Sequence, residues 1–291
     1  MFSRLFSFLV CGVAAVTVAT AAPNTKSQKK GTPQGLFTAS GAARVSPPKP
    51  KPLDTRQVVG YLLADNEVSV TQDLVVPRWD SSMKAPLSLL QEAEGLQPHY
   101  DAKGLQKKPA IVFDGVMDVM LGVVPELRGN QRTMTLVMQV NKLPVKLTTL
   151  LLLNGTEGLA LKADGGLRAI MPQDPDLPVE VVETEPLKGA CIVTLCMGDG
   201  ATQIFVNGTR MGLAEVNNAN PEMPLNSLVQ LGCDGFNGAV AAAVILNRML
   251  PPIERRALEM TFSKKFNIPL GEESPLPYRK PRMGKIINGK I

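Results

Sequence analysis

Two pairs of glutamates have the spacing that acid–base chemistry could use. They are Glu183 with Glu185 and Glu92 with Glu94. Hydrolysis of a glycosidic bond with retention of configuration requires two carboxyl groups about 5 Å apart, and one strand can supply them. Pro186 follows the first pair directly, and the second pair lies in a polar stretch that favours helical or irregular structure. We therefore expect neither pair to lie in register on a strand, and the sequence predicts that the chain is not an enzyme.

Three single residues are the candidates for binding a ligand or a metal ion. Asp114 precedes Gly115 after an apolar run, so its carboxylate could contribute to a calcium site or accept backbone N–H groups in a turn. We expect the turn, and hence neither a metal nor another cofactor. His99, the only histidine, has no second histidine or cysteine near it in the sequence, which favours an exposed loop position. Trp79, the only tryptophan, could form a platform on which a sugar ring stacks.

The cysteines and two glycosylation sequences add little further chemistry. Cys191 and Cys196 lie on one predicted strand, face opposite sides and are about 16 Å apart, too far for a disulfide bond. Cys233 could bond one of them, or all three thiols could remain reduced.

Asn154 and Asn207 each begin an Asn-Gly-Thr sequence, which is an N-glycosylation acceptor in a secreted eukaryotic protein. Asn-Gly is also a preferred pair for a tight hairpin turn.

The positive charge of the chain lies in its two ends. The formal net charge is +5 at pH 7, yet residues 1–53 contain seven Lys or Arg and no acid, and residues 271–291 contain five Lys or Arg and two Glu. The segment 54–270 between them is therefore acidic overall. Proteins that bind nucleic acids gather basic residues and stacking aromatics on a folded surface. The sequence does not have that distribution, so a nucleic acid is not expected as a partner.

Residues 1–22 have the pattern of a targeting segment. A short basic start is followed by an apolar run and by Ala19-Thr20-Ala21, which suits a signal peptidase. A cleaved signal peptide, an uncleaved membrane anchor and a mitochondrial presequence all stay open. Residues 23–53 predict a flexible Lys- and Pro-rich linker, and residues 271–291 predict a basic, Pro-rich tail. A secreted or membrane-tethered location follows, with the mitochondrion as the alternative.

Between these ends, residues 54–270 show a periodicity of two. Short runs rich in Val, Ile, Leu and Thr are separated by Gly, Asn, Asp and Pro, which is typical of antiparallel strands joined by turns. Asp199-Gly200 and Asn207-Gly208 predict tight hairpins on either side of a strand at 202–206. The predicted fold class is therefore all-β, an antiparallel two-sheet jelly-roll sandwich, and a second domain is not expected.

A single short helix is predicted near the end of this region. Pro251 and Pro252 precede it, and Leu258, Phe262 and Phe266 then recur every four residues. These three side chains share one face of a helix, which gives that face its apolar character. We expect the helix to pack against the sandwich.

Several short motifs occur in a specific order between Val75 and Ile268. They are Arg78–Ser82, Pro109–Gly115, Asp199–Gly208, Phe236–Ala241 and Val244–Leu250. In this order they resemble the laminin G-like branch of the concanavalin A-like lectin/glucanase superfamily. The resemblance implies a jelly roll of two curved antiparallel sheets, a packing role for Trp79, and a rim at which some members bind calcium. It does not extend to Pro144–Leu153 or Pro172–Pro186, so it assigns no ligand site.

We expect a non-enzymatic recognition module that binds a glycan or a protein partner at the cell surface or outside the cell. Lectins often use exposed aromatic rings, and Trp79, Tyr61 and Tyr100 are the only Trp and Tyr of residues 54–270. The alternative is a structural or accessory subunit of a larger membrane-associated assembly, a mitochondrial one included, that uses the sandwich for docking. An uncleaved N-terminal segment would place the chain on a membrane. Binding residues concentrate in loops, and the expected contact loops are 83–108, 141–146, 172–188 and 213–226.

Overall fold

The computed structural model describes residues 57–83, 85–125, 127, 129, 131–171, 182–198, 200–215, 226–233 and 235–272. These residues belong to one unit that extends from Pro48 to Ile291. Three predicted segments lie outside the described residues: the targeting segment 1–22, the whole linker 23–53 and the C-terminal tail after Glu272. Most of the two predicted contact loops 172–188 and 213–226 lies outside them as well.

All described strands of three residues or more belong to two antiparallel sheets, and so does the short β2. In sheet A the order is β14 (Thr209–Glu215), β13 (Ala201–Val206), β12 (Ala190–Gly198), β8 (Arg132–Lys142), β16 (Asn237–Leu246), β6 (Lys108–Asp114) and β5 (His99–Leu105), and β1 (Val58–Leu63) also pairs with β16. In sheet B it is β11 (Leu167–Ile170), β10 (Glu157–Leu161), β9 (Thr148–Leu153), β15 (Asn226–Leu231), β7 (Met120–Pro125), β4 (Ser88–Leu90), β3 (Arg78–Asp80) and β2 (Val68–Ser69). The predicted all-β sandwich is confirmed.

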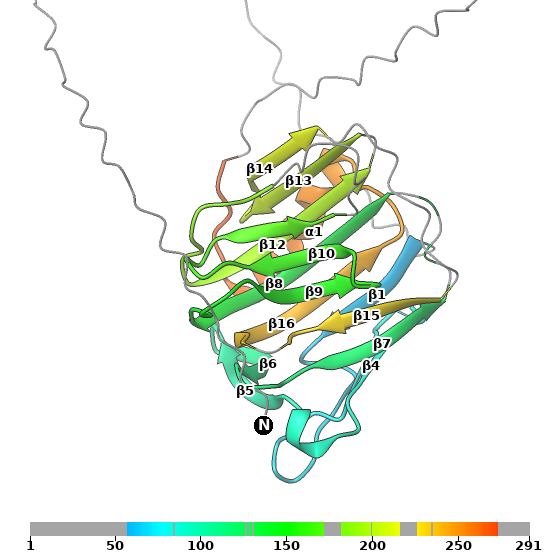
Figure 1. Cartoon of the computed structure of the whole chain (residues 1–291), viewed down its shortest axis with the longest axis vertical. Coiled ribbons are helices and arrows are strands. Elements are labelled where there is room, and N and C mark those ends of the chain that lie inside the picture. The colour runs from blue at the N-terminus through cyan, green and yellow to red at the C-terminus, as the bar shows by residue number, and fades with distance from the viewer. Residues whose placement is uncertain are drawn as a thin grey trace, which may run out of the picture. The chain divides into compact units, whose positions relative to one another are not determined.

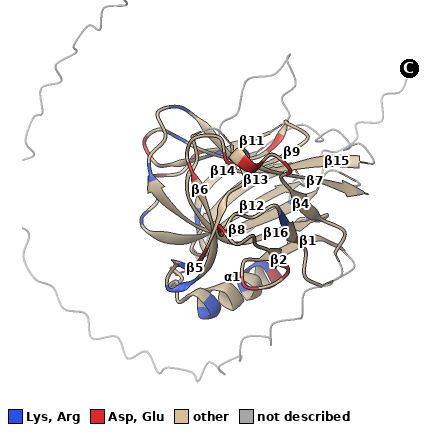
Figure 2. Cartoon of the chain, turned by 90° about the horizontal axis from the view of Figure 1, so that it is seen from below, with Lys and Arg blue, Asp and Glu red and all other residues tan. Residues whose placement is uncertain are grey.

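The two sheets and helix α1 (Pro252–Phe266) form three layers, which Figure 2 shows from below. Figure 1 looks onto sheet B, with sheet A and then α1 behind it. One cluster of buried side chains fills the space between the sheets. A second cluster joins sheet A to α1, through residues such as Val137, Val244 and Phe262. The central strands of sheet A, β12, β8 and β16, are therefore buried on both faces over most of their length.

Strand β16 lies at the centre of sheet A. One side pairs with β8 along its whole length, and the other side pairs with β6 through residues 237–240 and with β1 through residues 242–246. The first and last strands of the sandwich are thereby neighbours. Every β16 residue after Asn237 is buried. A continuous apolar run is what a strand covered on both faces requires, so the alternation expected of a half-exposed strand is absent here.

Helix α1 has the bounds that the sequence predicts. Pro252 occupies its first turn, where a missing N–H costs nothing. Asn267 ends it in the left-handed conformation with φ 53°, and its N–H donates to the Ser263 carbonyl oxygen. Leu258 and Phe262 are buried against sheet A, as the shared apolar face implied. Among the residues that the structure describes, no helix combines the length and apolar character needed to cross a membrane.

The prediction that 83–108 is a loop is wrong. This segment contains β4, the 3-10 helix η2 (Glu94–Leu96) and β5. Only Leu105 of β5 is buried, because β5 is the edge strand of sheet A and faces solvent over most of its length. His99, expected in a loop, is the first residue of β5 and pairs with Val112. A polar edge strand does not have the alternation by which strands are predicted.

Candidate functional site

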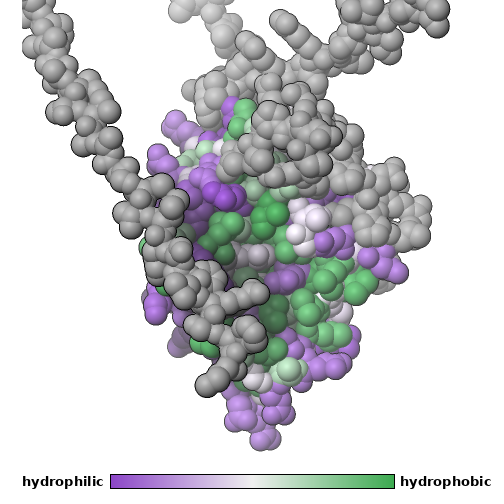
Figure 3. All heavy atoms as spheres, in the orientation of Figure 1, coloured by the Kyte–Doolittle hydropathy of each residue, from purple (hydrophilic) through white to green (hydrophobic). Residues whose placement is uncertain are grey.

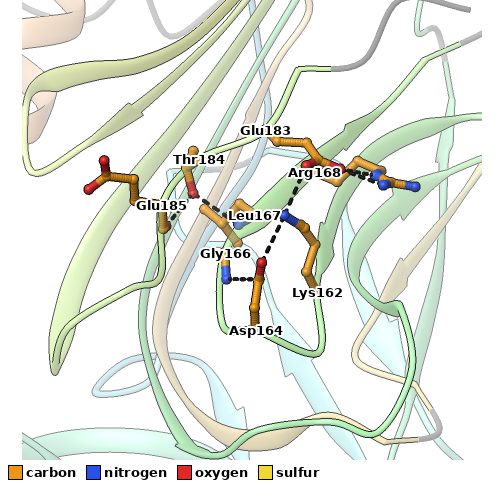
Figure 4. Close-up of polar contacts among 8 residues, drawn as sticks. All are labelled: Lys162, Asp164, Gly166, Leu167, Arg168, Glu183, Thr184 and Glu185. Carbon is orange, nitrogen blue, oxygen red and sulfur yellow. Dashed lines mark hydrogen bonds and ion pairs between the residues drawn. The ribbon is translucent and has the colours of Figure 1, made fainter. Parts of the chain in front are cut away.

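The carboxylate of Glu183 lies between two basic side chains at the edge of sheet B (Figure 4). Lys162 Nζ is 2.8 Å from Glu183 Oε2 and 3.0 Å from Asp164 Oδ2. Arg168 Nε donates to Glu183 Oε1 at 2.6 Å. Hydrogen bonds from Lys162 and Arg168 lower the pKa of Glu183 below its ordinary value. Glu183 is therefore ionised at neutral pH and is not available as a proton donor.

The backbone around Glu183 keeps the carboxylate of Glu185 away from that of Glu183. Two hydrogen bonds join Thr184 to Leu167 of the edge strand β11. The Thr184 N–H donates to the Leu167 carbonyl oxygen at 2.9 Å, and Thr184 Oγ1 accepts the Leu167 N–H at 2.9 Å. The segment also approaches sheet A, since an added Cβ on Gly212 of β14 would lie 2.9 Å from the Glu183 carbonyl oxygen. The Glu185 side chain is exposed and points away from Glu183 (Figure 4). The two glutamates do not form a carboxyl pair.

Four further glutamates are either exposed or fully buried. Glu92 and Glu94 are both exposed, and Glu94 begins η2. Glu157 and Glu259 were not singled out from the sequence. Burial raises the pKa of both, and their exposed fractions are 1% and 0%. These two carboxylates are enclosed by packed layers and do not reach solvent.

Trp79 is fully buried, with an exposed fraction of 0%. Its indole N–H donates to the Leu63 carbonyl oxygen at 3.1 Å. The ring fills the core between the two sheets, so it is not a platform for a sugar. Tyr61 is half-buried, with its ring centroid 6.0 Å from that of Phe262, and Tyr100 is half-buried as well. The described residues therefore present no fully exposed Trp or Tyr ring.

Asp114 is the last residue of β6 and begins the turn that leads to β7. Its Oδ1 accepts the Val116 N–H at 2.7 Å, and its own N–H donates to Asp118 Oδ2 at 2.7 Å. Gly115 has φ 82°, a conformation that glycine adopts without strain. In the described part of the chain no group of three or more His, Cys, Asp or Glu side chains is arranged to hold a metal ion. The Asp114 carboxylate thus stabilises a turn.

The two glycosylation sequences both occupy turns with positive φ, at 49° for Asn154 and 50° for Asn207. Asn154 Nδ2 donates to Ser227 Oγ at 3.0 Å, and its Oδ1 accepts the Leu228 N–H at 2.7 Å. Asn207 Oδ1 accepts the Ile192 N–H at 2.8 Å. Each carboxamide holds its hairpin against a neighbouring strand.

Aliphatic side chains gather on the outer face of sheet B, a feature that the sequence reasoning about loops missed. Leu90, Leu121, Val123 and Leu228 are 41%, 40%, 54% and 44% exposed. The strand register pairs Leu90 with Leu121 and Val123 with Leu228, so these side chains are direct neighbours on one face. We name these four residues the sheet B patch. Figure 3 shows apolar residues on this side of the molecule.

Polar side chains border the sheet B patch. Arg78 pairs with Leu90 in the register and forms an ion pair with Asp80, with 2.7 Å between Nε and Oδ2. Arg168, at the other edge of the sheet, alternates with the buried Leu167 and therefore points to the outer face, where it meets Glu183. Strands β9 and β10 lie between it and the patch. An apolar centre with polar margins is the usual anatomy of a protein interface.

The sequence does contain a signal for the patch. Met120 and Val124 of β7 are buried in the core, while the intervening Leu121 and Val123 are exposed. A strand that is apolar at both odd and even positions has apolar side chains on both faces of the sheet. Either another layer covers each face, or one apolar face is exposed to solvent. Which of the two applies depends on the layer arrangement, because α1 covers sheet A and no described helix covers sheet B.

No protein-family model matches the chain, and no curated protein matches it. Solved structures do match. A Trypanosoma rangeli sialidase in complex with 2,3-difluoro-KDN has a TM-score of 0.52 and 18% identity, over 77% of this chain and 36% of that chain. The same sialidase with sialic acid has a TM-score of 0.50 and 18% identity, over 72% and 33%. The botulinum neurotoxin serotype D binding domain has a TM-score of 0.52 and 10% identity, over 72% and 51%.

The sialidase similarity corrects one prediction from the sequence. Because sialidases are enzymes, their similarity to this chain contradicts the expectation that it is not an enzyme. That expectation rested on the lack of a carboxylate pair, and sialidases use a tyrosine nucleophile instead of such a pair. The chain spans about a third of the sialidase chains and about half of the toxin domain. At these identities the comparisons show the fold alone, a β-sandwich that the chain shares with both groups.

Proposed function

We propose that the chain is a recognition module of the laminin G-like class that binds a protein partner through the sheet B patch, as an accessory subunit of a membrane-associated assembly. The observation that carries this proposal is the difference between the two outer faces of the sandwich. Helix α1 covers the central strands of sheet A, whereas the central strands of sheet B expose four contiguous aliphatic side chains. The order of sequence motifs and the sandwich fold support the laminin G-like class.

The chemistry of the patch favours a protein over a glycan. Sugar rings bind best against exposed aromatic rings, and the patch contains only Leu and Val. Trp79 lies in the core instead. Aliphatic side chains bounded by an ion pair such as Arg78–Asp80 suit a partner with its own apolar surface and a complementary polar margin.

The patch is large enough to contribute to a specific contact. Each of its four side chains is 40% to 54% exposed, so covering each one contributes on the order of 1 kcal/mol. The side chains are contiguous, which allows them to enter one desolvated centre rather than four separate contacts. The polar margin would then supply orientation more than affinity.

The same proposal assigns roles to the ends of the chain. Residues 1–22 direct the chain to or across a membrane, and residues 23–53 connect the sandwich to that segment as a flexible linker. The assembly is then at the cell surface, with a mitochondrial membrane as the alternative. This part of the proposal rests on the sequence pattern.

Replacement of Val123 and Leu228 by Asp tests the patch. Both side chains are exposed but directly opposite each other in the register, so the two carboxylates of Val123→Asp/Leu228→Asp repel each other by up to about 1 kcal/mol. The thermal midpoint of the double variant should therefore fall by only a few degrees. The full chain is cross-linked in its source cells and purified, and the stoichiometric partners are identified by mass spectrometry. Binding of the principal partner should then weaken at least tenfold in the double variant.

The matched control is Ile253→Asp, which places the same charge on a residue of α1 that is 55% exposed. It should bind the partner as the wild type does. The proposal is overturned if the double variant retains full partner binding. It is also overturned if the wild type binds a glycan array and no protein, in which case the glycan replaces the protein partner.

A further inference from the structure

We propose that the loop between β8 and β9 contacts the surface of an anionic membrane. The loop connects sheet A to sheet B at one rim of the sandwich, over residues 143–147. Its Val145 side chain is 95% exposed, and Leu143 and Leu147 are 52% and 45% exposed. This contact is distinct from the sheet B patch and goes beyond the proposed partner binding.

A second loop adds apolar side chains at the same rim. Val116 and Met117, in the turn after β6, are 61% and 56% exposed. Asn237 connects the two loops, because it pairs in register with Asp114 at the end of β6 and with Lys142 at the end of β8. Both loops therefore leave sheet A side by side.

The concentration of aliphatic residues at this rim needs a cause. Single exposed aliphatic side chains are common on soluble proteins. Here five of them extend from two adjacent loops, and the Val145 side chain makes almost no contact with the rest of the protein. Each would gain about 1 kcal/mol or more on leaving water. Side chains on projecting loops enter a soft interface more readily than they fill a flat protein surface.

The charges of the loop identify the surface. Lys142 and Lys146 flank Leu143 and Val145 and are exposed, and no acidic residue occurs from Gln139 to Thr156. Each lysine near an anionic bilayer contributes about 1 kcal/mol of attraction. Acids next to this loop are engaged locally. Asp164 Oδ2 is 3.0 Å from Lys162 Nζ, and in the second loop Asp114 Oδ1 and Asp118 Oδ2 accept the N–H groups of Val116 and Asp114. The attraction to an anionic surface is therefore assigned to the β8–β9 loop and its two lysines. Aliphatic side chains between lysines match the boundary between acyl chains and anionic headgroups.

The experiment uses a tryptophan as a local probe, because residues 1–22 of the full chain could attach it to vesicles by themselves. Val145→Trp is prepared in the full chain, and vesicles of phosphatidylcholine with 30% phosphatidylserine are added. Trp79 is buried and serves as a constant background. The emission of Val145→Trp should shift to shorter wavelength, and lipids brominated in the acyl chains should quench it. Neither change should occur with phosphatidylcholine alone.

Two further variants separate this contact from other modes of attachment. Ile253→Trp, on the exposed face of α1, should show no shift on the same vesicles. Lys142→Glu/Lys146→Glu in the Val145→Trp background should require at least tenfold more lipid for the same shift. The inference is overturned if Val145→Trp keeps its emission while the chain sediments with vesicles, if the chain does not bind vesicles, or if Ile253→Trp responds equally.

The result is independent of the proposed partner. Val123→Asp/Leu228→Asp should bind the vesicles as the wild type does, and the lysine variant should bind the protein partner as the wild type does. If the sheet B patch does not bind a partner, the membrane contact of the β8–β9 loop is unaffected, and the reverse also holds.

Discussion

Arg132 and Glu157 face each other across the interior of the sandwich, with Arg132 Nε 3.8 Å from Glu157 Oε2. Each side chain is 1% exposed. Arg132 is the first residue of β8 in sheet A, and Glu157 is the first residue of β10 in sheet B. Arg132 Nη1 also donates to Asn247 Oδ1 at 3.0 Å. This ion pair connects the two sheets at a point where they are otherwise joined by apolar contacts.

The first prediction concerns the dependence of stability on pH. Burial raises the pKa of Glu157 to about 7 from its ordinary 4.5, and the nearby Arg132 offsets this only in part. The folded chain then holds a proton that the unfolded chain releases. This contribution to the free energy of unfolding is fully present below about pH 4.5 and is lost as the pH rises through about 7. The loss should be on the order of 3 kcal/mol.

Glu157→Gln should flatten this dependence, because the amide stays neutral at every pH. Denaturant unfolding at pH 5 and pH 8 measures the difference for the wild type and the variant. Glu185→Gln, at an exposed position, is the control and should follow the wild type. An unchanged difference between the two pH values in Glu157→Gln would show that Glu157 is not the titrating group.

The second prediction concerns the ion pair beneath α1. Arg255 Nη1 donates to both carboxylate oxygens of Glu259, at 2.8 and 2.7 Å, and the two residues are 2% and 0% exposed. The Arg255 guanidinium also lies 3.7 Å from the Phe205 ring centroid. Glu259→Leu leaves an uncompensated buried charge and should lower the free energy of unfolding by about 3–5 kcal/mol.

A double-mutant cycle separates the pair from its packing. Arg255→Met/Glu259→Leu removes both charges and should recover most of the stability lost in Glu259→Leu, since two apolar side chains fill the same space. Thermal unfolding of the two single variants and the double variant gives the coupling energy. Additive losses in the cycle would mean that the two side chains act separately.

The third prediction concerns the close approach of β4 and β7. Gly122 of β7 pairs with Leu89, and an added Cβ would lie 2.4 Å from the Ser88 carbonyl oxygen. Gly122→Ala should therefore cost about 1–3 kcal/mol, because a backbone atom has to move. Gly95→Ala is the control, since nothing lies within 4 Å of its added Cβ, and it should change stability by about 0.5 kcal/mol or less. Equal stabilities of the two variants would argue against the pairing of these strands.

Local patterns in the sequence determined the hairpins and the helix. Asn207 and Gly208 adopt φ 50° and 79° between β13 and β14, as the dipeptide predicted. The spacing of Leu258, Phe262 and Phe266 located both α1 and its buried face. These features depend on residues a few positions apart, whose backbone preferences act in any context.

The position of each element relative to the others was decided by the tertiary structure. The sequence of β5 is polar and predicts a loop. It forms a strand because it pairs with the edge of β6. The ion pairs of Arg132 with Glu157 and of Lys162 with Glu183 join residues of different elements. The sheet B patch is exposed because the one described α-helix, α1, packs on the opposite sheet. Such contacts depend on strand register and on which face of a sheet another layer covers. The periodicity of the sequence predicts only that a face is apolar, not what packs against it.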